Sequence, residues 1–157
     1  MLGVETLCFN PENANELVTG SHDKLIKLWD LNKFKNTSVL EGHTGGVWAT
    51  DFSYDGKLLM SASPDRTIML WDLKKKKPSH TLKEHKNKVY IASFNEDSKF
   101  IASGGEDQRL IIWDLRKAAP LKSIETENKI IYSARWSKCG KFLFTTEYGG
   151  IIKVFDT

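Results

Sequence analysis

A repeat with a fixed period of 42 residues runs along the chain. Each repeat closes on an aromatic residue followed by an aspartate, and the four closing pairs are Trp29-Asp30, Trp71-Asp72, Trp113-Asp114 and Phe155-Asp156. A period in the low forties that ends on a Trp-Asp pair is typical of a unit made of four short strands. The chain is therefore an array of one repeated unit.

Short apolar segments separated by polar turns recur inside every repeat. Gly, Pro, Asn and Asp interrupt the apolar segments about every ten residues, so the pattern does not fit helices. An all-β architecture remains, and the last repeat is one outer strand short. We expect strands over residues 4–9, 17–21, 26–29, 38–40, 47–52, 58–61, 68–71, 81–82, 89–94, 100–103, 110–113, 123–124, 131–136, 142–145 and 151–155.

The Trp-Asp pairs and the segment Ser-Ala-Ser-Pro-Asp-Arg-Thr-Ile-Met-Leu-Trp-Asp at 61–72 resemble the WD-repeat β-propeller family over essentially all 157 residues. The resemblance implies a single all-β propeller segment with blades at approximately 1–43, 44–85, 86–127 and 128–157. It also implies that the four blades form an arc or half-ring of a larger propeller with seven or eight blades. More chain, a second copy or a partner subunit would then complete the ring.

The resemblance further implies a buried hydrogen-bonded network within the blades. A serine, a histidine and an aspartate also suggest a catalytic triad, but this set recurs, always with an aromatic partner, so we interpret it as structural. In the fourth repeat the matching positions hold Glu127, Thr145, Gly149 and Phe155, and there we expect apolar packing instead. The network positions are His43, Ser61, Asp65 and Trp71; His85, Ser103, Asp107 and Trp113; and, in part, Thr19, Asp23 and Trp29.

Two further positions of each repeat lie, by resemblance, at the rim of the narrow face of the propeller, near its central channel. Tyr and Trp combine apolar area with a polar tip and dominate interface hot spots, so we predict a partner-binding surface here. The alternative is that the aromatics pack as core between blades. The first position holds Glu5, Trp48, Tyr90 and Tyr132, and the second holds His22, Pro64, Glu106 and Tyr148.

The charge and the residue spacings of the sequence limit the classes of ligand that we expect it to bind. The net charge is only +3 with 27% charged residues, so nucleic acid is unlikely to be a direct ligand. The lysine run at 74–77 falls in a loop and is interpreted as a solvated surface. No histidine or cysteine spacing indicates a metal, and no glycine spacing indicates a phosphate loop, so we expect no cofactor.

Cys8 and Cys139 form no disulfide framework, which fits a reducing compartment. The N-terminal residues do not resemble a signal peptide, and no apolar stretch reaches about 18 residues. We therefore expect an intracellular protein, in the cytoplasm or nucleus, that does not enter a membrane.

The resemblance implies a non-catalytic scaffold that binds proteins or peptides as a platform subunit of a larger complex. An alternative comes from Trp113-Asp114-Leu115-Arg116. This segment resembles the Trp-Asp-x-Arg box through which some WD-repeat proteins dock on the adaptor of cullin-RING ubiquitin ligases. Under that alternative the chain is a substrate receptor, and Arg116 contacts the adaptor. An enzyme is the third hypothesis, and the repetition of the network argues against it.

Overall fold

A computed structural model of the chain describes residues 3–127 and 129–157, and within these ranges the regular structure consists of strands alone. Blade 1 comprises β1 (Val4–Asn10), β2 (Asn13–Ser21), β3 (Ile26–Asp30) and β4 (Lys35–Leu40). Blade 2 comprises β5 (Ala49–Phe52), β6 (Leu58–Ala62), β7 (Ile68–Asp72) and β8 (Lys77–Leu82). Blade 3 comprises β9 (Val89–Phe94), β10 (Phe100–Gly105), β11 (Arg109–Asp114) and β12 (Ala119–Glu125). Blade 4 comprises β13 (Ile131–Trp136), β14 (Phe142–Glu147) and β15 (Ile151–Asp156).

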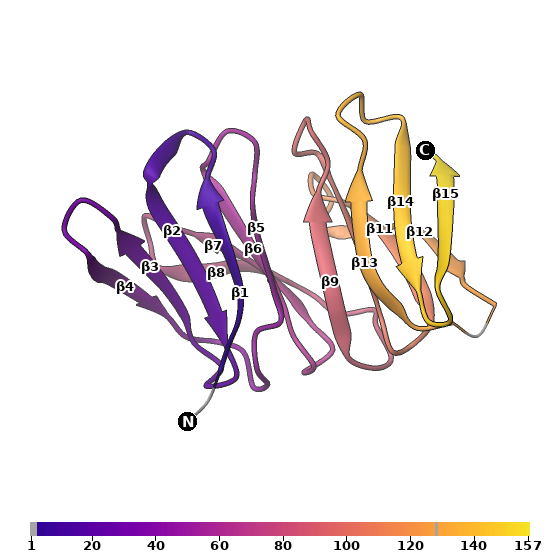
Figure 1. Ribbon diagram of the computed structural model, residues 1–157, viewed down its shortest axis with the longest axis horizontal. Coiled ribbons are helices and arrows are strands. Elements are labelled where there is room, and N and C mark those ends of the chain that lie inside the picture. The colour runs from indigo at the N-terminus through magenta and orange to yellow at the C-terminus, as the bar shows by residue number, and fades with distance from the viewer. Residues whose placement is uncertain (1–2, 128) are drawn as a thin grey trace.

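Every blade is an antiparallel meander in which each strand pairs with the next along the chain. The innermost strands contact one another in the order β1, β5, β9 and β13. Figure 1 shows the result: the blades follow one another across the molecule, with β1–β4 at one end and β13–β15 at the other. The expected all-β fold of four propeller blades is confirmed.

The apolar core lies between the blades. One cluster joins Val18, Ile26 and Leu28 of blade 1 to Phe52 and Trp71 of blade 2. A second cluster joins blades 2 and 3 around Trp113, and a third joins blades 3 and 4 with Phe155 packed against it. Trp71, Trp113 and Phe155, which close the second, third and fourth repeats, therefore pack against the preceding blade, and stacking of neighbours holds the array together.

Small residues set how closely two blades approach. Val47 lies against Gly20 of the preceding blade, and a Cβ added to Gly20 would be 2.5 Å from Cγ1 of Val47. Gly104 has the same relation to Ile131, whose Cγ2 would lie 2.7 Å from such a Cβ. Real Cβ atoms do not approach other carbons so closely, so these positions require glycine for the observed packing.

The predicted strand limits differ from the structure in two respects. The strand expected at 47–52 begins at Ala49, and the amide of Val47 before it donates to Ser21 O of blade 1. The outer strands and β2 begin earlier than expected, and their extra residues are mostly polar and exposed. Such residues carry no apolar signal, and in each outer strand this part also contains a register shift of the ladder.

Candidate functional site

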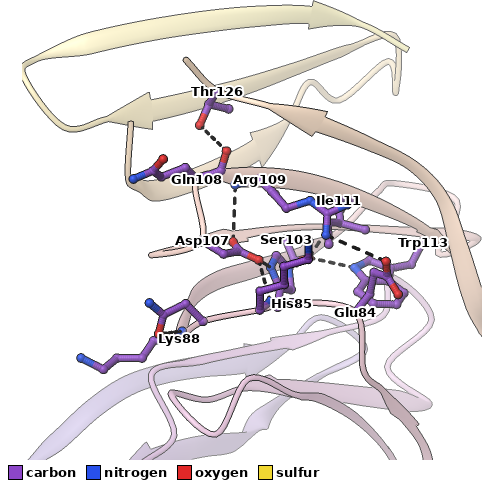
Figure 2. Close-up of polar contacts among 12 residues, drawn as sticks. Glu84, His85, Lys88, Ser103, Asp107, Gln108, Arg109, Ile111, Trp113 and Thr126 are labelled. Carbon is purple, nitrogen blue, oxygen red and sulfur yellow. Dashed lines mark hydrogen bonds and ion pairs between the residues drawn. The ribbon is translucent and has the colours of Figure 1, made fainter. Parts of the chain in front are cut away.

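A chain of hydrogen bonds runs through blade 3 (Figure 2). The indole Nε1–H of Trp113 donates to Ser103 Oγ at 2.8 Å, and Ser103 Oγ lies 2.7 Å from His85 Nε2. His85 Nδ1 lies 2.8 Å from Asp107 Oδ2. An ionised carboxylate can only accept, so Nδ1 carries the proton, and Nε2 of the neutral ring accepts from the serine hydroxyl. Each polar group thus satisfies the next one.

The same chain is present in blade 2 with the same spacing. Trp71 donates to Ser61 Oγ at 2.8 Å, and His43 lies 2.7 Å from Ser61 and 2.8 Å from Asp65 Oδ2. Thr67 adds a hydrogen bond from Oγ1 to Asp65 Oδ1 at 2.6 Å. Thr67 gave no sequence signal, because the matching position of blade 3 is Arg109.

The aspartates of both chains have lowered pKa values. Burial acts to raise the pKa of Asp65, but hydrogen bonds from His43, Thr67 and the amide of Thr44 outweigh it and hold the pKa far below its usual range. Burial likewise opposes the shift at Asp107, where the hydrogen bond from His85 and amide donors lower the pKa. The folded blade therefore favours the ionised form of both carboxyl groups.

The two serine hydroxyls are not placed for nucleophilic chemistry. Ser61 and Ser103 are fully buried, and each oxygen accepts the indole proton of its tryptophan. A nucleophile must reach the reacting atom of a substrate, and these oxygens lie in the interior between strands. The arrangement can cross-link strands within a blade, and it offers no access to a substrate.

Blade 1 contains only part of this arrangement. Trp29 Nε1–H donates to Thr19 Oγ1 at 2.9 Å. Asp23 lies apart from that pair, because its Oδ1 accepts from the amide of Leu25 and its Oδ2 lies 3.7 Å from Lys27 Nζ. The structure therefore brings together two of the three positions expected in this blade.

Blade 4 lacks the network, and a buried ion pair is present in addition to the apolar packing of this blade against blade 3. The side chain of Glu147 is fully buried, and its Oε2 lies 3.4 Å from Lys153 Nζ. Thr145 Oγ1 donates to Glu147 Oε1 at 3.3 Å, and Lys153 Nζ also lies 3.7 Å from Glu127. The positions of blade 4 that match network residues hold Glu127, Thr145 and Gly149. Glu147 and Lys153 instead stand at positions that hold no network residue in the other blades.

Four aromatic rings from successive blades form a continuous row. The ring of His22 meets Trp48 edge-on at 6.3 Å, Trp48 lies 5.1 Å from Tyr90, and Tyr90 stacks on Tyr132 at 5.8 Å with 5° between the planes. These four residues are called the aromatic row below. Tyr132 is exposed, and Trp48 and Tyr90 are half-buried. The row lies outside the three apolar clusters between the blades.

Charged groups border the aromatic row. Glu5 Oε1 lies 2.9 Å from His22 Nε2, and Glu106 pairs with Lys88 at 3.3 Å. Burial raises the pKa of Tyr90, and the negative charge of Glu106 adds to the shift. The remaining positions expected at this rim, Pro64 and Tyr148, are half-buried and exposed respectively.

Arg116 lies away from the aromatic row, in the turn between β11 and β12. Its Nε and Nη2 donate to Asp114 at 3.0 and 2.8 Å, a bidentate arrangement that orients the guanidinium. The side chain of Arg116 is nevertheless 67% exposed. A partner can therefore reach the outer edge of this group.

Among residues 3–127 and 129–157, no cluster of His, Cys, Asp and Glu side chains is arranged to hold a metal ion. The same part of the chain contains no helix long and apolar enough to cross a membrane. Both cysteines are free in the structure, Cys8 half-buried and Cys139 exposed.

Comparison with known proteins places the repeats in one family. Four segments, residues 2–30, 34–72, 76–114 and 118–156, match the family described as "WD domain, G-beta repeat". Similar proteins include "Non-functional target of rapamycin complex subunit LST8-2" of Arabidopsis thaliana, 48% identical over 48 residues, which are 31% of this chain and 15% of the relative. The "F-box/WD repeat-containing protein sel-10" of Caenorhabditis elegans is 44% identical over 43 residues, 27% of this chain and 7% of the relative.

The "General transcriptional corepressor TUP1" of Saccharomyces cerevisiae is 33% identical over 51 residues, 32% of this chain and 7% of the relative. The aligned part is therefore a small share of each relative's own length. The four family matches, in contrast, extend over nearly all of the present sequence, and each of the last three runs from the outer strand of one blade to the third strand of the next. The chain belongs to the WD-repeat family.

Proposed function

We propose that this protein is a non-catalytic scaffold, a platform subunit of a larger complex, and that a protein or peptide partner binds the aromatic row. The observation that carries the proposal is the row itself. Trp48, Tyr90 and Tyr132 come from three separate blades, yet their rings contact one another in one line at the surface. A rigid array of aromatic groups binds with little loss of side-chain entropy.

The groups around the row suit a polypeptide ligand. Tyr and Trp rings supply apolar contact area, while the phenol and indole groups donate hydrogen bonds to a backbone. Glu5 and Glu106 add acceptors at the border. The networks of blades 2 and 3 link strands of the two blades that contribute Trp48 and Tyr90, so this part of the surface is fixed before a partner arrives.

Capture from a cell extract with purified variants tests this proposal. Proteins retained by the wild type should be lost with Trp48→Ala and with Tyr90→Ala, because each change removes one ring of the row. Tyr54→Ala is the matched control, since Tyr54 is an exposed aromatic in a turn of blade 2 outside the row. Retention of the same proteins by all three variants would show that the partner binds elsewhere.

A second candidate function is substrate receptor of a cullin-RING ubiquitin ligase, and the exposed, oriented guanidinium of Arg116 favours it. Two relatives have names that include ligase-associated terms, "F-box/WD repeat-containing protein sel-10" and "WD repeat and SOCS box-containing protein 1". A pull-down with the ligase adaptor should succeed with the wild type and fail with Arg116→Ala. Lys117→Ala, at the neighbouring exposed position, is the control.

The cellular location of the protein and the completion of its propeller ring are part of the same proposal. We propose an intracellular location, in the cytoplasm or nucleus, supported by the two free thiols. Nucleic acid is not proposed as a direct ligand. The four blades are proposed to belong to a ring of seven or eight, completed by more chain, a second copy or a partner subunit.

A further inference from the structure

The connections between the third strand and the outer strand of a blade carry the basic excess of the chain. In blades 1, 2 and 3 they run over residues 30–35, 72–77 and 114–119, from the last residue of one strand to the first residue of the next. These segments contain eight basic and three acidic residues, a net charge of +5, whereas the whole chain has a net charge of +3. The rest of the molecule is therefore slightly acidic, and positive charge is concentrated at these connections.

All eight basic side chains are exposed, and we call them together the basic rim. Blade 2, which packs between blades 1 and 3, contributes half of them. Its charges therefore remain at the surface when a blade has a neighbour on each side. The basic rim comprises Lys33, Lys35, the four lysines at 74–77, Arg116 and Lys117.

The three connections share one backbone conformation and lie at one end of the blades. A matching residue in each turn has a positive φ, which is 48° at Phe34, 54° at Lys76 and 48° at Ala118. Because each strand is antiparallel to the next, the third strand finishes at the end where the first strand also finishes (Figure 1). The aromatic row lies at the other end, where the first strands begin. The basic rim is thus a series of equivalent turns on the face opposite to the row.

Each turn neutralises one of its basic groups with its own aspartate. Lys75 Nζ lies 3.4 Å from Asp72 Oδ2, and Arg116 Nη2 lies 2.8 Å from Asp114 Oδ2. The matching pair of blade 1, Lys33 and Asp30, has a distance of 3.0 Å. Within residues 3–127 and 129–157, the structure pairs none of the other five rim lysines with a carboxylate. Five positive charges are therefore available to a ligand.

The same aspartates also occupy the backbone donors of the turns. Asp72 Oδ1 accepts from the amides of Lys74 and Lys75 at 2.9 and 3.0 Å, and the matching aspartates of blades 1 and 3 bind turn amides likewise. These amides cannot form a nest that fixes a single phosphate or carboxylate. Recognition at the rim depends on lysine side chains, which act as flexible point charges. The rim therefore suits a ligand with many negative charges and no required geometry.

We propose that the basic rim docks on the surface of a membrane rich in anionic phospholipids. Clusters of roughly four to eight lysine and arginine residues bind such surfaces, and each residue contributes about fivefold to the partition constant. A flat layer of headgroups contacts the turns of several blades at once, whereas a nucleic acid would have to follow the rim from blade to blade. Docking of this kind requires contact with headgroups alone, so the chain does not enter the hydrocarbon.

The composition of the rim favours a lipid surface over an acidic protein. Interfaces between proteins are depleted of lysine, yet seven of the eight rim residues are lysines. The lysines at 74–77, interpreted from the sequence as a solvated surface, thereby gain a ligand. Docking by the rim leaves the aromatic row facing away from the bilayer, so the row stays open to a partner. The proposal goes beyond partner binding and does not depend on it.

Co-sedimentation of the full chain with vesicles tests the proposal. The wild type should bind phosphatidylcholine vesicles that contain roughly one third phosphatidylserine, and it should not bind pure phosphatidylcholine. Raising the salt from about 0.1 M to about 0.5 M should release it. The combined variant Lys74→Gln, Lys75→Gln, Lys76→Gln, Lys77→Gln should bind the anionic vesicles at least about tenfold more weakly. These side chains are exposed, so its circular dichroism spectrum and melting temperature should be unchanged.

A matched variant removes the same number of charges from the opposite end of the blades. The combined variant Lys24→Gln, Lys83→Gln, Lys86→Gln, Lys88→Gln changes four exposed lysines and should bind nearly as tightly as the wild type. An equal loss of binding in both combined variants would show that only net charge matters and would overturn the proposal. Absence of wild-type binding to the anionic vesicles at about 0.1 M salt would overturn it as well.

A variant on another blade tests whether the rim acts as one surface. Lys33→Gln with Lys35→Gln should weaken vesicle binding by about fivefold, and full binding by this variant would contradict a rim that spans blades. Tighter binding of the wild type to duplex DNA or to polyglutamate than to the vesicles, at equal salt and equal concentration of negative charge, would identify a different class of ligand and overturn the proposal. Trp48→Ala should retain vesicle binding, so the membrane test and the partner test can fail independently.

Discussion

The indole nitrogen of Trp71 lies 2.8 Å from the hydroxyl oxygen of Ser61 on the adjacent strand, and the same 2.8 Å separates Trp113 and Ser103 one repeat later. Each serine is also bound by a histidine from the segment that leads into the blade. Three separate stretches of chain are therefore tied together at one oxygen in each of two blades. A sheet of only four short strands gains a fixed geometry from such a buried link.

Removal of the aspartate at the end of this link should destabilise the protein. Asp65→Ala leaves the His43 Nδ1–H and the turn amides without their acceptor, which should lower the free energy of unfolding by roughly 2–3 kcal/mol. Trp71→Ala removes a fully buried ring and should cost about 3–5 kcal/mol. Urea melts measure both, with Asp156→Ala, an exposed aspartate at the end of β15, as the control. Losses below about 1 kcal/mol for both variants would contradict a structural network.

Acid should unfold the protein partly through the same two aspartates. The pKa values of Asp65 and Asp107 are lowered in the folded state, so their contribution to stability is complete above the unfolded value of about 4. It is lost as the pH falls from there towards the folded pKa. Urea melts between about pH 6 and pH 3 should show this decline. The double variant Asp65→Asn, Asp107→Asn should start less stable and decline less steeply, and an equally steep decline would assign the effect to other carboxyl groups.

The aromatic row can be distinguished from core by comparing stability with affinity. Trp48 and Tyr90 are half-buried, and their rings contact each other and their neighbours in the row. Trp48→Ala should therefore weaken partner binding by about 2 kcal/mol or more while the melting temperature stays nearly constant. Calorimetric titration and thermal melts of the same samples measure the two quantities. A large fall in melting temperature would identify the rings as core.

The two cysteines should differ sharply in reactivity. Burial raises the pKa of Cys8 to about 12, whereas a hydrogen bond with Ser137 lowers the pKa of the exposed Cys139 thiol. The thiolate is the reactive form, so iodoacetamide at neutral pH should modify Cys139 first. Mass spectrometry should find one adduct on the native protein and two after denaturation. Cys139→Ser should abolish the native adduct, and equal labelling of both cysteines would contradict this geometry.

The close approach of Val47 to Gly20 should make that glycine sensitive to substitution. The added methyl of Gly20→Ala would overlap Cγ1 of Val47 and Cγ2 of Thr6, which should cost about 1–3 kcal/mol. Val47→Ala removes the first of these atoms, so the double variant should lose less stability than the sum of the single variants. Additive losses in urea melts would show that the strain lies elsewhere.

The repeat period made most of the fold predictable. Trp29, Trp71 and Trp113 fix the position of the third strand in each blade, and the apolar segments before them fix the first two. The outer strands were located less well, because residues such as Lys77 and His80 pair through backbone groups while their side chains are exposed. Pairing of this kind does not require an apolar pattern.

The polar contacts were predictable only where they repeat. His43 and Asp65 recur as His85 and Asp107, so one offset located both pairs. The pair of Glu147 and Lys153 occurs once, and no periodicity points to it. The aromatic row was expected as four separate positions, but contact between the rings depends on how far one blade is rotated from the next, which the sequence does not specify.

Each blade contacts only the blades before and after it, and this has a consequence for local opening. Blades 2 and 3 are covered on both sides, while blades 1 and 4 are covered on one side each. In a linear array, stability is approximately a sum of units and of contacts between neighbours, so a single copy should fray inward from both ends. Amide hydrogen exchange should then be slowest in β6 and β10 and fastest in β1 and β15.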